Sequence, residues 1–164
     1  MSSMDLILHP EDSERFSEIL AQLRLDSHSV AVFLIAKDGQ EIASAGQTDR
    51  FDSTSLASLT AGNVAATDGL AKLIGEQEFS VLFHEGQQEH IHISVVARRA
   101  ILVVIFDDRS SLGLVRLRVK RANTELERIF ERMEARSGSD MGMSGAASPF
   151  AEITDEDIDA LFSE

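Results

Sequence analysis

The sequence contains no cysteine, no tryptophan and no tyrosine, and only two of its 164 residues are proline. Without cysteine, the chain can form neither a disulfide nor a thiolate metal site. No stretch approaches eighteen consecutive apolar residues, as a membrane-spanning helix requires, and the first sixteen residues lack the basic start and long apolar run of a secretory signal. We therefore expect a cytoplasmic protein whose core is built from aliphatic residues and nine phenylalanines.

Basic residues are missing from positions 137–164, which hold seven acidic residues. The formal net charge of −13 therefore leaves −6 on residues 1–136. This balance argues against general nucleic-acid binding, which requires a basic surface. The one basic run, VRLRVKR at residues 115–121, is interpreted as the solvated side of a helix or as a contact for acidic partners.

Hydrophobic periodicity predicts one α+β domain over residues 1–136. Pro10, followed by two acidic residues, predicts a helix start, and Asp38-Gly39 after an apolar run predicts a hairpin. The expected architecture is a five-stranded, mostly antiparallel sheet with a long middle helix on one face and the N- and C-terminal helices on the other. The expected helices cover residues 10–25, 54–74 and 110–133, and the expected strands cover residues 30–36, 41–44, 79–84, 89–96 and 100–106.

The C-terminal part is expected to comprise a flexible linker, residues 137–148, and an acidic tail, residues 149–164. A helix would place Ile158, Leu161 and Phe162 on one face, and Phe150 adds a further apolar side chain. Because isolated helices of this length are marginal in water, we expect the tail to be disordered alone and to fold against a partner. Docking of the tail onto its own domain is the alternative.

The middle helix has two distinct sides when residues 54–74 are placed at 100° per residue. A solvent-exposed side would normally carry good helix formers such as Glu and Lys, and each glycine costs about 0.5–1 kcal/mol relative to alanine. We therefore interpret the small-residue side as a face that another backbone approaches closely, with packing under an internal strand as the alternative. The larger residues, Leu56, Leu59, Asn63, Leu70 and Ile74, are expected on the sheet, opposite Ser58, Ala61, Gly62, Ala65 and Gly69, with Asp68 and Lys72 close by.

Three stretches of the sequence carry a joint resemblance: DSTSLASLTAGNVAATDGLAKLIGE (52–76), AILVVIFDDRSSLGLVRLRVKRA (100–122) and SPFAEITDEDIDALFSE (148–164). Together they resemble the Roadblock/dynein-light-chain family, and in particular its MglB-like bacterial branch. The resemblance implies a homodimer in which two middle helices lie side by side and the two sheets join edge to edge. It also implies that the dimer accelerates GTP hydrolysis by an MglA-like small Ras-like GTPase in cell polarity and gliding motility, so that enrichment at a cell pole is expected.

The same resemblance implies two sets of site residues. One GTPase would lie across the paired middle helices, while the tail would bind a separate patch of the GTPase and favour nucleotide exchange. The alternative is a non-catalytic adaptor dimer that links the GTPase to a polar or cytoskeletal scaffold. The residues implied are Ser58, Ala61, Ala65, Gly69 and Lys72 on the helix, and Phe150, Ile158, Leu161 and Phe162 on the tail.

Catalytic chemistry of the chain's own is not expected. Neither a GxxxxGK[ST] loop nor a GxSxG elbow occurs, so GTP and Mg would be held by the partner and no cofactor by this chain. Arg50 and Arg109 are interpreted as surface or ion-paired charges, because MglB-like activators are understood to reposition the GTPase's own catalytic groups. His90 and His92, with His84 across the hairpin, are interpreted as the solvent-facing side of a strand, with a metal site as the less favoured alternative.

Overall fold

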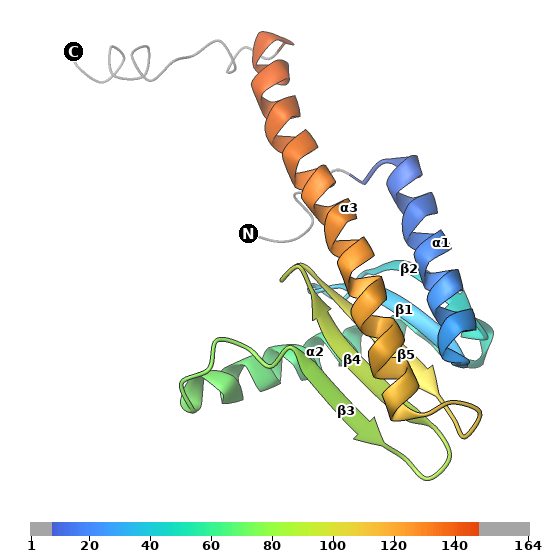
Figure 1. Ribbon diagram of the computed structural model, residues 1–164. Helices are drawn as coiled ribbons and strands as arrows, with labels where there is room; N and C mark the ends of the chain where they lie inside the picture. The colour runs from blue at the N-terminus through green and yellow to red at the C-terminus, as the bar shows by residue number, and fades with distance from the viewer. Residues whose placement is uncertain (1–7, 148–164) are drawn as a thin grey trace.

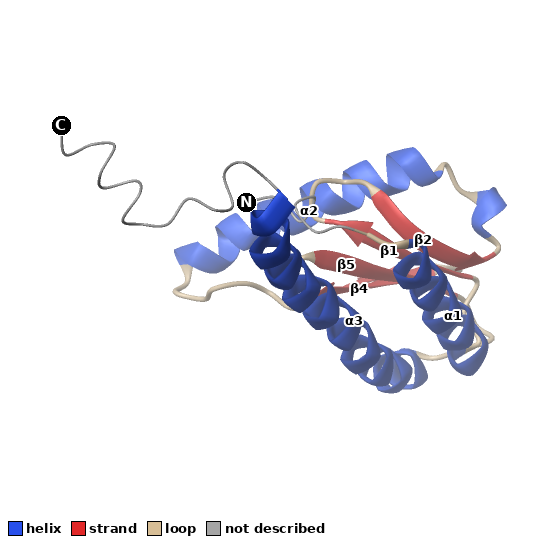
Figure 2. Cartoon of the chain, turned by 90° about the horizontal axis from the view of Figure 1, so that it is seen from above, coloured by secondary structure: helices blue, strands red, loops and turns tan. Residues whose placement is uncertain are grey.

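The computed structural model describes the backbone of residues 8–147 and the side chains as far as residue 138. Five strands form one sheet in the order β2-β1-β5-β4-β3, and every neighbouring pair is antiparallel. Helix α2 covers one face, whereas α1 and α3 cover the other (Figures 1 and 2). The predicted fold class is thereby confirmed. The elements are α1 Pro10–Ser27, β1 Ala31–Ala36, β2 Glu41–Gly46, η2 Thr48–Arg50, α2 Ser53–Leu73, β3 Val81–Glu85, β4 His90–Val96, β5 Ala100–Phe106 and α3 Leu112–Ala147.

The two central strands, β1 and β5, are buried along their whole length. Because successive side chains of a strand point to opposite faces, each strand supplies two cores. Val32 and Val104 belong to the core beneath α1 and α3, and Phe33 and Val103 belong to the core beneath α2. This arrangement confirms the prediction that the continuous apolar run at residues 100–106 is a strand covered on both faces.

Helix α1 begins as predicted from its sequence. Pro10 occupies the first turn, and the backbone N–H of His9 donates to the Asp12 carboxylate at 3.0 Å. Arg136 of α3 also donates to that carboxylate, which ties the two helices together. Burial would raise the pKa of Asp12, but the hydrogen bonds from Arg136 and His9 and the nearby positive charge lower it overall. The start of α1 is therefore also its anchor on α3.

Helix α3 is longer than predicted and reaches Ala147, through residues that the composition indicated as a linker. A helix that is already nucleated extends at the gain of one hydrogen bond per residue, and the first proline after it is Pro149. Small residues without a breaker therefore continue the helix. Figure 1 shows α3 carrying its C-terminal end away from the sheet. No helix in the described part of the chain is long and apolar enough to cross a membrane.

Candidate interaction site

Helix α2 carries the predicted site residues, and Asp52 fixes where it starts. The Asp52 carboxylate accepts from the backbone N–H of Ser55 at 3.3 Å and from its hydroxyl at 2.9 Å. These hydrogen bonds from Ser55 lower the pKa of Asp52, because they favour its ionised form. An anionic N-cap satisfies free N–H groups of the first turn and complements the helix dipole.

The side of α2 that faces the sheet differs from the prediction. The buried residues are Ala57, Thr60, Val64 and Ala71, not the leucines, so the helix is turned by about a quarter turn from the expected orientation at 100° per residue. Short side chains let the helix axis lie close to the sheet, and the long ones are directed away from it. Leu59, Leu70 and Ile74, which were expected on the sheet, are exposed. Leu56 and Asn63 are half-buried and do face the sheet, since Leu56 packs against the core beneath α2 and Asn63 contacts His84 of β3.

Four large aliphatic side chains are exposed along α2 and at its C-cap, and we call them the leucine strip: Leu59, Leu70, Leu73 and Ile74. Their exposed fractions are 74%, 55%, 82% and 67%. Large apolar side chains gathered at this exposure are typical of an interaction surface. Figure 1 shows the C-terminal part of α2 projecting past the strands. The described part of the protomer therefore leaves the strip uncovered.

Next to the leucine strip lie the small residues predicted to meet the GTPase. Ser58, Ala65, Gly69 and Lys72 are exposed, and a methyl group added at Gly69 would meet nothing within 4 Å. Ala61 is half-buried and packs on the core beneath α2. We call the four exposed residues the small-residue strip. Packing under the protomer's own strands, the alternative interpretation, does not apply to them.

The turn between β1 and β2 packs against α2 beside two of the small residues. Gly39 lies in the left-handed region (φ 97°), and a Cβ there would lie 3.7 Å from Cα of Ser58 and 3.8 Å from Cβ of Ala61. The hairpin therefore approaches the helix closely, and Gly39 satisfies the turn conformation without strain. This contact fixes one end of the small-residue strip relative to the sheet.

Strand β3 lies at the edge of the sheet, and its outer side pairs with no other strand among residues 8–147. It presents two partly exposed apolar side chains, Val81 and Phe83, with exposed fractions of 50% and 37%. Phe83 stacks on Phe106, with 6.1 Å between the ring centroids. An open, apolar edge strand is a template for pairing with another chain.

Both exposed arginines singled out from the sequence have carboxylate partners. Arg109 donates to both oxygens of Asp107, from Nε at 3.1 and 3.2 Å and from Nη2 at 2.9 Å. This contact lowers the pKa of Asp107 and raises that of Arg109. Arg50 donates to Glu89 at 2.8 Å and lies over the Phe51 ring. Both contacts agree with the interpretation of these arginines as ion-paired charges.

The histidines do not converge on one point, and the prediction that they line a solvent-facing side is wrong for His92. His92 is only 2% exposed, because α3 covers this face of β4. His84 pairs with Ile91 in the sheet, on the opposite face, where its Nε2 lies 3.0 Å from Nδ2 of Asn63. Residues 8–147, as far as they are described, contain no group of three or more side chains that could hold a metal ion.

Burial of His92 makes stability depend on pH. Burial is the main cause that lowers the pKa of His92, and the charge of Arg116 adds to it. The unfolded chain therefore binds a proton more readily, so stability is complete above the ordinary pKa of about 6.5 and falls as the pH drops below it. In urea unfolding at pH 5 to 8, we expect His92→Leu to flatten this dependence by up to about 1.4 kcal/mol per pH unit. An equal pH dependence in both proteins would contradict this assignment.

The predicted tail contacts Phe150, Ile158, Leu161 and Phe162 lie outside the described residues. Sequence reasoning missed the leucine strip. Its signal was present, because Ala57, Thr60, Val64 and Ala71 recur at helical spacing and provide a second candidate for the buried side.

Comparison with known proteins gives a consistent result. The sequence profile of the Roadblock/LC7 domain family matches residues 15–106. MglB of Myxococcus xanthus is 53% identical, with a TM-score of 0.74 over 78% of this chain and 96% of that chain. The gliding protein MglB of Thermus thermophilus is 34% identical, with a TM-score of 0.73 over 77% of this chain and 96% of that one. An MglB with a tetrameric arrangement is 33% identical, with a TM-score of 0.73 over 78% and 96%. A comparison with curated proteins finds no significant match.

Proposed function

This chain belongs to the Roadblock/LC7 family, in its MglB-like branch, and on that basis we propose that it is a homodimeric regulator of an MglA-like small Ras-like GTPase. In this proposal the dimer accelerates GTP hydrolysis by the GTPase and acts in cell polarity and motility, at a cell pole. The single observation that carries the proposal is the exposed side of α2, where an apolar strip and a small-residue strip run next to each other.

The leucine strip supports dimerisation. Covering a leucine or isoleucine side chain contributes roughly 1.5–3 kcal/mol, and four such residues stand exposed on each copy. A two-fold axis would bring the same strip of both copies together, since a symmetric interface uses one surface twice. The open edge of β3 supports joining of the two sheets by backbone hydrogen bonds.

The small-residue strip supports GTPase binding. With the leucine strips facing each other, the strips formed by Ser58, Ala65, Gly69 and Lys72 would flank the two-fold axis on one surface. A single asymmetric GTPase could then contact both copies at short backbone distance. We include Ala61 in the proposed contact set at its half-buried position.

Activation without an inserted arginine is part of the proposal. Arg109 and Arg50 are each held by a carboxylate, which would have to be released before either side chain could reach a nucleotide. We expect Arg109→Ala and Arg50→Ala to change stimulated GTP turnover by less than about tenfold, whereas loss of an arginine finger costs about 10³–10⁵. Phosphate release at saturating regulator measures this. A drop of two or more orders of magnitude with binding intact would mean that the chain supplies a finger.

The deciding experiment compares phosphate release by the cognate GTPase alone, with the full chain, and with residues 149–164 deleted. Stimulation that survives the deletion assigns activation to the α2 surface, and a selective loss of nucleotide exchange assigns exchange to the tail. GTP and Mg would be bound by the GTPase, and no cofactor by this chain. Absence of any response, with binding retained, would favour the non-catalytic adaptor that links the GTPase to a scaffold.

A further inference from the structure

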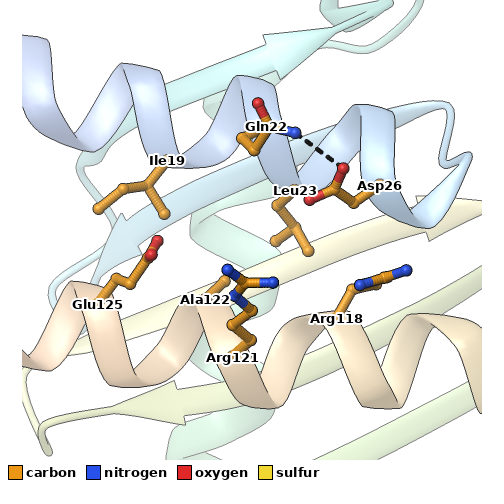
Figure 3. A pocket seen from close by; sticks show the side chains of 8 residues that line it. All are labelled: Ile19, Gln22, Leu23, Asp26, Arg118, Arg121, Ala122 and Glu125. Atoms are coloured by element: carbon orange, nitrogen blue, oxygen red, sulfur yellow. Dashed lines mark hydrogen bonds between the residues drawn. The ribbon is translucent and has the colours of Figure 1, made fainter.

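A groove runs between α1 and α3, on the face of the sheet opposite α2 (Figure 3). Its volume is about 350 Å³, and its apolar lining comes from Ile19, Leu23 and Ala122. A pocket of this size admits the tips of a few side chains and not a whole protein surface. Ile19, Leu23 and Ala122 are themselves buried, so they form a narrow apolar floor between walls of polar and charged side chains.

One wall of the groove is basic, and its guanidinium hydrogen-bond donors are not all paired with an acceptor. Arg118 and Arg121 line it, and α3 carries no acidic residue between Leu112 and Thr124. Neither arginine makes a hydrogen bond or ion pair with the described part of the chain, and Nε of Arg118 is shielded from solvent without a partner. Shielded donors normally have an acceptor, and a guanidinium matches a carboxylate in geometry and charge.

The acidic side chains of the groove do not act as acceptors for Arg118 and Arg121. Asp26 accepts a hydrogen bond from the Gln22 amide at 2.8 Å across one turn of α1. Glu125 lies at the opposite end of the groove from Arg118 (Figure 3). A ligand with carboxylates at the Arg118 end and apolar side chains along the lining would complement the groove.

We propose that the groove binds the acidic tail, residues 149–164, of a second copy of this chain. The tail has six acidic residues and no basic one, which complements Arg118 and Arg121. In a helix, its Ile158, Leu161 and Phe162 share one face and match the apolar lining.

A helical tail of the same chain cannot reach the apolar lining of the groove. From Ala122 to Ala147, α3 covers 25 residues, or roughly 38 Å at 1.5 Å per residue. With residues 149–158 helical, the path from Ala147 to Ile158 spans only about 20 Å. A helical tail in this groove must therefore come from another copy.

Such binding would give the tail a second binding site, in addition to the one proposed on the GTPase. The contact needs no GTPase, so it can be tested independently of the proposed function. If the tail also binds the GTPase, the groove and the GTPase compete for the tail. The groove would then keep the tail bound while no GTPase is present. The same contact would link copies of the chain to one another at high concentration.

A fluorescent peptide of residues 148–164, titrated into the full-length protein and followed by anisotropy, tests the proposal. We expect saturable binding that weakens with salt, and at least tenfold weaker binding to Arg118→Glu/Arg121→Glu. A matched control, Arg128→Glu/Arg132→Glu, makes the same charge change on exposed positions of the same helix, and we expect less than twofold effect. Replacing Ile158, Leu161 and Phe162 of the peptide by serine should abolish binding.

Three results would overturn the proposal: no binding to the wild-type chain, unchanged binding to the groove variant, or an equal loss in the control, which would indicate attraction by net charge alone. Circular dichroism establishes that each variant is folded. If the arginine pair variant fails to fold, Gln22→Glu places an acid at an exposed position on the other wall. It should weaken binding by repulsion, and unchanged binding would again overturn the proposal.

Discussion

Replacing both Leu70 and Leu73 by aspartate is expected to convert the proposed homodimer into a monomer. These side chains are 55% and 82% exposed on a single protomer, so their burial would belong to the dimer interface. Losing roughly 1.5 kcal/mol or more per leucine amounts to about 6 kcal/mol over two copies, or about 10⁴-fold in the dissociation constant. Light scattering after gel filtration should report half the wild-type mass.

The control for this variant is Leu25→Asp/Leu117→Asp. These leucines are also exposed, at 58% and 61%, but they lie on α1 and α3, on the other face of the sheet. We expect this control to remain dimeric. A leucine-strip variant that keeps the wild-type mass while folded would show that the strip is not the dimer interface.

Gly69→Arg is expected to abolish GTPase binding and, with it, the stimulation of hydrolysis. The added side chain meets no atom of the protomer within 4 Å at its Cβ, and arginine favours a helix over glycine by nearly 1 kcal/mol. The fold should therefore be retained or slightly stabilised. On the small-residue strip, however, the long side chain would hold another backbone away, so we expect affinity to fall by more than about a hundredfold, or roughly 3 kcal/mol. Ala65→Arg should act in the same way.

Gly113→Arg provides the matched control, because Gly113 lies at the start of α3 and a methyl group added there would also meet nothing within 4 Å. Pull-down of the GTP-loaded GTPase and phosphate release should both be unaffected by this control. Undiminished binding by a folded, dimeric Gly69→Arg protein would remove the small-residue strip from the proposed function.

The elements and their order along the chain could be predicted from the sequence because each element carries its own signal. The run of apolar residues in β5 indicates a strand covered on both faces, and Asp38-Gly39 indicates the turn that joins β1 to β2. Pro10 and Asp12 define the start of α1. These signals come from residues close together in the sequence, so they can be recognised without knowledge of the tertiary contacts.

The orientation of α2 could not be predicted, because periodicity does not say which of two apolar sides faces the protein's own sheet. Leu59 and Leu70 are more hydrophobic than Ala57 and Thr60 and were therefore assigned to the core. A helix that carries a buried side and an interface side violates the assumption that the more apolar side is the inner one. His92 shows the same limit, since only the placement of α3 buries it.

The length of α3 has a consequence for how the chain would hold a partner. Past Arg136, which bridges to α1, the helix continues for eleven residues to Ala147, or about 16 Å. A GTPase held by the following tail would stay tethered within a small volume, where effective concentrations reach the millimolar range for short linkers. Rebinding to α2 would then outpace escape into bulk solution. Through avidity of this kind, two separate contacts would give a higher overall affinity than either contact alone. Shortening the helix would change that overall affinity without altering either contact.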